Sequence, residues 1–176
     1  MLTDEQIVCR VRQGDLDAYG ELVERYQRRL VAAAHHLVGD EDAARDVVQE
    51  TFIQGYRHLE QLRDAAKAGA WLYGILRHRA HSWLAARRPT VSWEDESVDE
   101  WFVAADPAER VDMTALLAGL PAADRDALAA RYLMDLSYDE VAKALGTTPQ
   151  NARVRVCRAK ERLRNLLDRA EKEVGL

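Results

Sequence analysis

The sequence predicts an all-α protein in which two small helical domains are joined by an acidic linker. Apolar residues recur at intervals of three and four, the spacing of one helix face, through most of the 176 residues. A segment with two prolines and many acids interrupts this pattern after residue 88. Near the C-terminus, capping and turn residues occur in the order typical of a helix-turn-helix. We therefore expect domains at 1–88 and 111–176 and a linker at 89–110, with the helix-turn-helix in the second domain.

Composition limits the class of protein. A hydrophobic content of 48% is ample for a packed core. The N-terminus "MLTDEQ" lacks the basic and apolar regions of a secretory signal, and the longest clean apolar run, "LVAAA", is too short to span a membrane. Two cysteines, Cys9 and Cys157, form no metal or disulfide framework, which favours a reducing cytoplasm. We expect no membrane insertion and a half-buried Cys157.

In the N-terminal half, three helices follow from the apolar spacing. The first is predicted over residues 16–38. The second begins after Gly39, with Asp40 as its N-cap and acids in its first turn, and extends to about residue 59. The stretch "QLRDAAKAG" is interpreted as a short connection. Another helix is predicted over about residues 70–86, before the first linker proline.

In the C-terminal half, a helix is expected near Met113 and another over residues 121–135, with "GLP" as the break between them. Ser137 and Glu140 then form a capping box, which starts a short helix over residues 138–145.

The turn that follows this short helix indicates a helix-turn-helix. Gly146 can take the positive φ that a helix C-cap requires. Thr148 can cap the next helix, and Pro149 suits its first position. Small Ala142 lets the two helices approach, and the angle between them can be closed by Val141, Leu145 and Ala152. A bare helical hairpin would not require a small residue, glycine, cap and proline in this order.

Charge is concentrated locally on a chain whose net charge is -5. Lys and Arg cluster in residues 63–88 and 143–164, and eight acids lie between these clusters in residues 92–112. Basic clusters on an otherwise acidic chain indicate local attraction to polyanions. In the last helix the basic residues avoid an apolar stripe made by Ala152, Val156, Ala159 and Leu163. This arrangement suits a recognition helix in a major groove, and the alternative is a charged helix that covers its own core.

The first turns of this recognition helix are predicted to read duplex DNA. Arg153 and Arg158 are long enough for bidentate contact with guanine, and Val154 can contact a thymine methyl group. Arg155 lies on the flank of the stripe and is aimed at a phosphate row. The full set of expected duplex contacts is Gln150, Asn151, Arg153, Val154, Arg155 and Arg158.

The stretch "WLYGILRHRAHSWLAARR" interleaves aromatic rings with cations. This mixture suits unstacked bases and their phosphates, because every base has a π-face. The alternative is that the aromatic residues are ordinary core. His78 and His81 share a helix face, but without further ligands nearby we expect no metal and no cofactor. The expected single-strand contacts, including two in the preceding connection, are Arg63, Lys67, Trp71, Tyr73, Arg77, His78, His81, Arg87 and Arg88.

Over about residues 16–167 the chain resembles the extracytoplasmic-function (ECF) sigma factors of bacterial RNA polymerase, group 4 of the sigma-70 superfamily. The most specific match is "DVVQETF" at 46–52. The stretch "AWLYGILRHRAHSWLAARR" resembles the helix that engages the melted promoter -10 element. The domain that reads the -35 element is similar to the segment "LLAGLPAADRDALAARYLMDLSYDEVAKALGTTPQNARVRVCRAKERLR".

The resemblance implies a protein that binds core RNA polymerase, directs it to specific promoters and assists promoter melting. It implies docking on the clamp helices of the β′ subunit, further contact with the β subunit, a linker in the RNA exit path and a cognate anti-sigma factor. The resemblance also implies that the loop "QLRDAAKAG" captures a base flipped out of the -10 element. The residues implied in polymerase docking are Asp46, Gln49, Glu50 and Phe52.

The sequence leaves three possible functions: a sigma factor, a stand-alone regulator of transcription and a helical interaction protein. We expect no enzyme, because the sequence has no phosphate-cradling loop, nucleophile elbow or metal-ligand cluster. One rival to a sigma factor is a stand-alone helix-turn-helix transcriptional regulator that binds duplex DNA without polymerase. The other is a helical interaction protein whose basic clusters bind an acidic partner. Salt-dependent duplex binding would exclude the latter.

Overall fold

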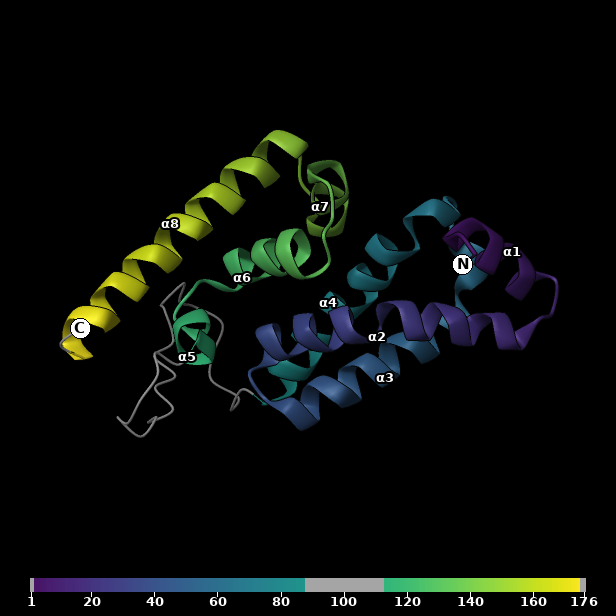
Figure 1. Cartoon of the computed structure of the whole chain (residues 1–176), viewed down its shortest axis with the longest axis horizontal. Helices are drawn as coiled ribbons and strands as arrows, with labels where there is room; N and C mark the ends of the chain where they lie inside the picture. The colour runs from purple at the N-terminus through teal and green to yellow at the C-terminus, as the bar shows by residue number, and fades with distance from the viewer. Residues whose placement is uncertain (1, 88–112, 175–176) are drawn as a thin grey trace.

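The computed structural model describes residues 2–87 and 113–174, and in the second range it describes side chains from 115 to 172. Throughout these residues the regular structure is helical, which confirms the all-α fold class (Figure 1). The expected linker at 89–110 and Arg88 lie outside the described residues. No helix in the described ranges is both long and apolar enough to cross a bilayer.

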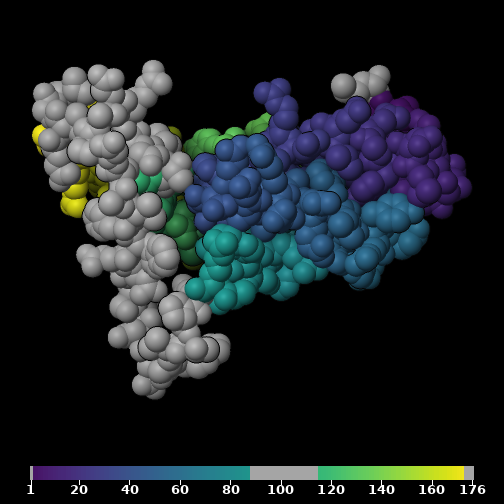
Figure 2. All heavy atoms as spheres, turned by 90° about the horizontal axis from the view of Figure 1, so that it is seen from below, coloured from purple at the N-terminus to yellow at the C-terminus, as the bar shows by residue number. Residues whose placement is uncertain are grey.

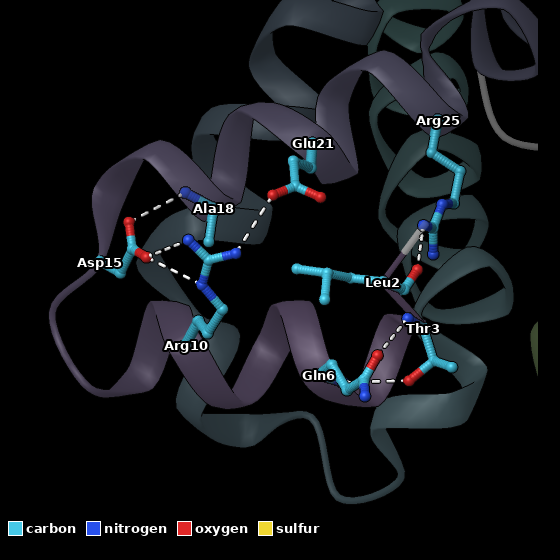
Figure 3. Close-up of polar contacts among 8 residues, drawn as sticks. All are labelled: Leu2, Thr3, Gln6, Arg10, Asp15, Ala18, Glu21 and Arg25. Carbon is cyan, nitrogen blue, oxygen red and sulfur yellow. Dashed lines mark hydrogen bonds and ion pairs between the residues drawn. The ribbon is translucent and has the colours of Figure 1, made fainter.

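The structure begins with a helix that the apolar spacing did not predict, α1 (Asp4–Arg12). A capping box starts it: the Gln6 backbone N–H donates to Thr3 Oγ1 at 3.3 Å, and the Thr3 backbone N–H donates to Gln6 Oε1 at 2.8 Å (Figure 3). Its buried face consists of Ile7, Val8 and Val11. Nine residues are too short for a periodicity argument, so the capping box was the available signal.

Polar contacts hold α1 against the next helix, α2 (Leu16–Val38). Arg10 donates through Nε and Nη2 to Asp15 Oδ2 at 2.9 and 2.7 Å, and its Nη1 lies 3.4 Å from Glu21 Oε1 (Figure 3). Arg25 of α2 donates to the Leu2 carbonyl oxygen. These bonds fix the turn between α1 and α2.

The remaining N-terminal helices follow the sequence closely. Gly39 ends α2 with φ 75°, and Asp40 caps α3 (Glu41–Arg57) as predicted. The short connection predicted at "QLRDAAKAG" contains helical turns. These are η1 (Leu59–Gln61) and η2 (Ala65–Lys67), which lead into α4 (Ala68–Arg87).

Two glycines let these helices pack closely. A Cβ on Gly69 at the start of α4 would lie 2.6 Å from Cε1 of Tyr26 in α2. A Cβ on Gly55 of α3 would lie 2.9 Å from Leu72 Cδ2 and from the Tyr19 hydroxyl. Helices α2, α3 and α4 therefore form one tightly packed bundle.

The C-terminal half contains α5 (Met113–Ala118), α6 (Ala122–Leu128), α7 (Tyr138–Leu145) and α8 (Pro149–Val174). The single helix expected over 121–135 is wrong in detail, because its second part is a π-helical turn, η3 (Ala129–Leu133). The Met134 N–H donates to the Ala129 carbonyl at 3.0 Å, and Asp135 ends the turn with φ 56°. Small Ala129 and Ala130 are fully buried, which allows η3 to pack closely against α2.

The two halves pack against each other. Helix α2 contacts η3 and α6, and α4 contacts α7. One hydrophobic core contains Leu30 and Leu72 from the N-terminal half together with Met134 and Val141 from the C-terminal half. In the space-filling view the green C-terminal surface borders the blue helices of the N-terminal half (Figure 2). The two halves thus share one large apolar core.

Candidate nucleic-acid interface

The helix-turn-helix is built as the sequence indicates. Ser137 Oγ accepts from the Glu140 N–H at 3.4 Å, and the Ser137 N–H donates to Glu140 Oε2 at 2.9 Å. Gly146 closes α7 with φ 66°. Thr148 Oγ1 accepts from the Asn151 N–H at 3.2 Å, which caps α8. Each turn residue therefore fills the role that its chemistry predicts.

Helix α8 buries one face and exposes the other. The predicted stripe is confirmed, because Ala152, Val156 and Ala159 are buried and Leu163 is half-buried. The expected half-buried Cys157 is wrong: its side chain is exposed, because it lies beyond the edge of this stripe. Toward its end α8 packs on a smaller core that includes Leu120 and Leu128.

All six residues expected to contact duplex DNA are exposed on α8. Val154 has 41% of its surface exposed, so its methyl groups are accessible to a partner. The Arg153 guanidinium lies 5.0 Å from the centre of the Tyr138 ring, which belongs to α7. This cation–π contact orients Arg153 beside the turn, and sequence spacing alone did not identify Tyr138 as its partner. The exposed set is Gln150, Asn151, Arg153, Val154, Arg155 and Arg158.

The residues expected to contact single-stranded DNA fall into two groups. Arg63, His78 and Arg87 are exposed, and Lys67 and Trp71 are half-buried. These side chains lie along η2 and α4 or in the turn just before η2.

A cleft of about 650 Å³ lies beside Lys67, Trp71 and His78 of this first group, between η1, η2 and α4 on one side and α7 on the other. The predicted base-capturing loop forms part of its wall. Charged side chains from both halves and the Trp71 ring of α4 meet there. Its lining includes Gln61, Asp64, Lys67, Trp71, His78 and Arg79, together with Glu140, Lys143 and Ala144 of α7.

The second group, Tyr73, Arg77 and His81, contacts the C-terminal half. Arg77 Nε donates to Asp126 Oδ2 at 2.6 Å, and His81 Nε2 lies 3.1 and 3.0 Å from the two Asp126 carboxylate oxygens. The buried Tyr73 hydroxyl donates to the Asp126 backbone carbonyl at 2.8 Å. One residue of α6 therefore binds three residues of α4, at positions spaced four apart on one helix face.

Electrostatics favour the ionised form of Asp126. Burial disfavours its charge, but hydrogen bonds from His81 and Arg77 outweigh burial and hold the pKa of this carboxyl below its ordinary value. Burial raises the pKa of the Tyr73 phenol well above its ordinary value, so the hydroxyl remains a donor. Sequence reasoning missed Asp126 because its partners are more than 40 residues away in the chain.

The residues of α3 that are implied in polymerase docking differ in their exposure to solvent. Asp46 and Gln49 are exposed, and the inward-facing Val47 and Val48 are buried as predicted. The half-buried carboxylate of Glu50 accepts from Gln54 Nε2 at 2.8 Å and lies 3.4 Å from Arg79 Nη2 of α4.

Phe52 is only 8% exposed, so it contributes mainly to the core. Ile53, the next residue, and Tyr56, one turn beyond Phe52, are exposed instead. Apolar spacing could not identify them, because an exposed apolar residue departs from that spacing. Within the described residues, no cluster of three His, Cys, Asp or Glu could hold a metal ion.

Comparison with protein families gives two matches that divide the chain. Sigma-70 region 2 matches residues 22–90, and sigma-70 region 4 matches residues 110–163. The first match covers most of α2 together with α3 and α4, and the second covers the helix-turn-helix.

Full-length relatives match as well. The chain is 32% identical to the ECF RNA polymerase sigma-E factor of Haemophilus influenzae over 93% of this chain and 95% of that protein. It is also 32% identical to the sigma-E factor of Escherichia coli K12, over 93% and 94% of the two chains.

Two solved structures share the fold. One is CnrH in complex with the cytosolic domain of CnrY, with a TM-score of 0.71, 24% identity and coverage of 94% of this chain and 97% of that one. The other is the sigma factor RpoE in complex with the anti-sigma factor NepR from Bartonella quintana, with a TM-score of 0.70, 24% identity and coverage of 87% and 98%.

Proposed function

This chain belongs to the sigma-70 family of RNA polymerase sigma factors, within the ECF group, and we propose that it recognises specific promoters through two surfaces and assists in melting them. The first surface is the exposed face of α8, which reads the -35 element. The second is the face of α4 with the preceding loop, which binds the melted -10 strand. The proposed units are residues 1–88 and 111–176, joined by a linker at 89–110.

The observation that carries this proposal is the exposed face of α8. A helix that follows a capped turn, buries an alanine and valine stripe and exposes Arg153, Val154 and Arg158 has the chemistry that major-groove readout requires. Arg155 lies nearer the stripe and contacts a phosphate. Gln150 and Asn151 extend the polar contacts at the start of the helix.

The -10 strand binds where aromatic rings and cations meet. The cleft beside Trp71 and Lys67 receives a base that is flipped out of the duplex. Extrusion costs a few kcal/mol, so a pocket that fits only one base rewards melting at the right sequence. His78, Arg87 and Arg63 hold the neighbouring phosphates, and Arg88, which lies outside the described residues, is proposed as a further contact of the same strand. Tyr73, Arg77 and His81 join the interface only when they are released from Asp126.

Core RNA polymerase binds α3. Exposed Asp46 and Gln49 provide polar contacts for the β′ clamp helices, and Ile53 and Tyr56 add the apolar contact. Glu50 is held beside this face by its ion pair with Arg79. Phe52 packs into the core behind it. The linker at 89–110 is proposed to follow the RNA exit path, and the β subunit is a further proposed partner of the chain.

The setting of the protein follows from its family. Sigma factors are not enzymes, and this chain performs no covalent chemistry and uses no cofactor. We place it in the cytoplasm with promoter DNA and core polymerase as partners. A cognate anti-sigma factor masks its polymerase-binding surfaces.

Co-elution and DNA binding test the proposal together. The full chain is mixed with core RNA polymerase and with a library of random duplexes. We expect the chain to form a stable complex with core enzyme. We expect the chain alone to show only weak sequence preference among the duplexes. Strong sequence-specific selection without any complex with core enzyme would instead identify a stand-alone regulator.

A further inference from the structure

Helix α1 has no part in the proposed contacts with DNA or polymerase, yet it packs against the loop that joins α3 to α4. This α3–α4 loop comprises residues 58–67, and α1 contacts both of its turns, η1 and η2. The apolar face of α1 joins the main hydrophobic core. A capping box at Thr3 and the bonds from Arg10 to Asp15 fix its two ends (Figure 3). Helix α1 is therefore a firm support beside the loop.

Arg12, the last residue of α1, bonds directly to the backbone of the α3–α4 loop. Its Nη2 donates to the Leu59 carbonyl oxygen at 3.0 Å and to the Leu62 carbonyl oxygen at 2.5 Å. Because the donor is charged, these bonds are stronger than bonds between neutral groups. Arg12 Nε also lies 3.9 Å from Glu60 Oε2, but the Glu60 side chain is 79% exposed, so this ion pair contributes little. The two carbonyl bonds are what tie α1 to the loop.

The α3–α4 loop has little regular structure of its own. The Leu62 N–H donates to the Leu59 carbonyl at 3.1 Å across η1, and the Lys67 N–H donates to the Asp64 carbonyl at 3.0 Å across η2. Single turns of this kind hold few bonds and open readily. The two carbonyls that Arg12 binds lie at the start of η1 and just after its end. Arg12 therefore fixes the backbone on both sides of η1.

The same loop forms one wall of the cleft that is proposed to receive the flipped base. Gln61, Leu62, Asp64 and Lys67 line this cleft, and Arg12 does not. Arg12 thus holds the wall from outside the cleft. A wall that is ordered before the base arrives favours binding, because a loop that must be ordered at that moment reduces affinity.

We propose that Arg12 is a positioning residue for base capture, which fixes the α3–α4 loop so that the cleft favours one flipped base of the -10 strand. The inference rests on the proposed function of this cleft. Without the Arg12 bonds the loop samples other positions, and affinity for the captured base falls with the fraction of molecules whose wall is in place. Arg12 touches no base, so contacts elsewhere on the strand keep their strength.

Three variants separate this role from general effects of α1. Arg12→Met keeps an unbranched stem and a good helix former but removes the donors. Arg12→Lys restores a cation whose three N–H groups can serve both carbonyl oxygens. Arg10→Met is the matched control, because Arg10 is on the same helix but bonds to Asp15 and Glu21, which lie outside the loop.

Amide hydrogen exchange of the full chain, without DNA or polymerase, measures the order of the loop. In Arg12→Met we expect the amides of Leu62 and Lys67 to exchange about tenfold faster than in the wild type, because the bonds that hold their turns in place are lost. Arg12→Lys should exchange nearly as slowly as the wild type, and Arg10→Met should leave these amides unchanged. Unchanged exchange of the loop in Arg12→Met would overturn the inference without affecting the proposed function.

Base selection is measured with the chain bound to core RNA polymerase and a pool of random single-stranded oligonucleotides that can span the -10 element. Arg12→Met should reduce base preference about tenfold at a single position of the enriched motif and should leave the other positions and the affinity for core enzyme unchanged. Arg12→Lys should restore the preference, and Arg10→Met should keep it. A loss spread evenly over the motif, an equal loss in Arg10→Met or no loss at all in Arg12→Met would overturn the inference. A wild-type complex that enriches no motif would instead refute the proposed -10 function.

Discussion

Base reading and phosphate contact are assigned to different arginines at the start of α8. Arg153→Ala or Arg158→Ala should cost about 1–3 kcal/mol on the preferred -35 duplex and relax the choice at one or two bases. Arg155→Ala should weaken binding to all sequences alike and lower the salt slope by about one. The measurement is titration of the full chain against a library of duplexes at several salt concentrations.

The opposite pattern would contradict this assignment. If Arg155→Ala changes base preference while the other two variants change only the salt slope, α8 enters the groove with a different face forward. Arg164→Ala is a suitable control, because this exposed arginine lies six residues beyond Arg158 on α8, away from the first turns of the helix.

At the polymerase-docking face, Asp46 is the sharpest single test. Asp46 is exposed on α3, so Asp46→Lys should leave the fold intact, within about 0.5 kcal/mol, and should greatly weaken binding to core polymerase. Glu50 is less suitable, because its reversal would also break the contact with Arg79. Asp168→Lys on α8 makes the same change in net charge and should bind normally in a pull-down. Equal binding by the two variants would remove Asp46 from the docking face.

At the scale of elements, the crossing of α2 and α4 depends on Gly69. In Gly69→Ala the new Cβ meets the ring of Tyr26, whose hydroxyl is held by the Asp4 side chain, so the ring cannot move away freely. We expect a loss of about 1–3 kcal/mol in the free energy of unfolding by urea.

Gly74 on the same helix is the matched control. A Cβ there meets nothing within 4 Å, so Gly74→Ala should stabilise the protein by about 0.5–1 kcal/mol through helix propensity. Equal effects of the two substitutions would show that the close approach at Gly69 does not matter.

Local chemistry explains which elements the sequence could predict. Asp40, Ser137, Gly146 and Thr148 act within three or four residues of themselves, so their roles as caps follow from spacing. The π-helical turn η3 could not be predicted in this way, because it depends on the packing of Ala129 and Ala130 against α2. The short helix α1 was missed because it offers few apolar positions.

At the scale of the whole molecule, His36 should make the packing of the two halves sensitive to pH. Burial lowers the pKa of His36, although its bond to the Arg125 carbonyl and the charge of Asp126 oppose this effect. A depressed folded-state pKa contributes stability that is present above about pH 6.5 and is lost as pH falls through the folded value. We therefore expect lower stability toward acid pH.

The variant His36→Gln isolates this contribution. A glutamine N–H can still donate to the carbonyl but does not titrate in this range. Urea unfolding at about pH 7.5 and 5.5 should show a smaller loss of stability in the variant than in the wild type. An identical loss in both proteins would assign the pH dependence to other groups.

The packing of the halves is the feature that the sequence indicated least. Charge clusters indicated two basic segments, but they could not reveal that Arg77 and His81 pair with Asp126, which lies 45 to 49 residues further along the chain. Long-range pairing of this kind depends on how α4 and α6 meet.

The central claim is that this chain selects promoters for core RNA polymerase. Sequencing the 5′ ends of transcripts made on genomic DNA by core enzyme, with and without the full chain, tests it most directly. We expect new 5′ ends that depend on the chain and share two upstream elements, and we expect Arg153→Ala to alter the preferred sequence of the -35 element. If the 5′ ends match those of core enzyme alone, the chain does not direct initiation and the account is wrong.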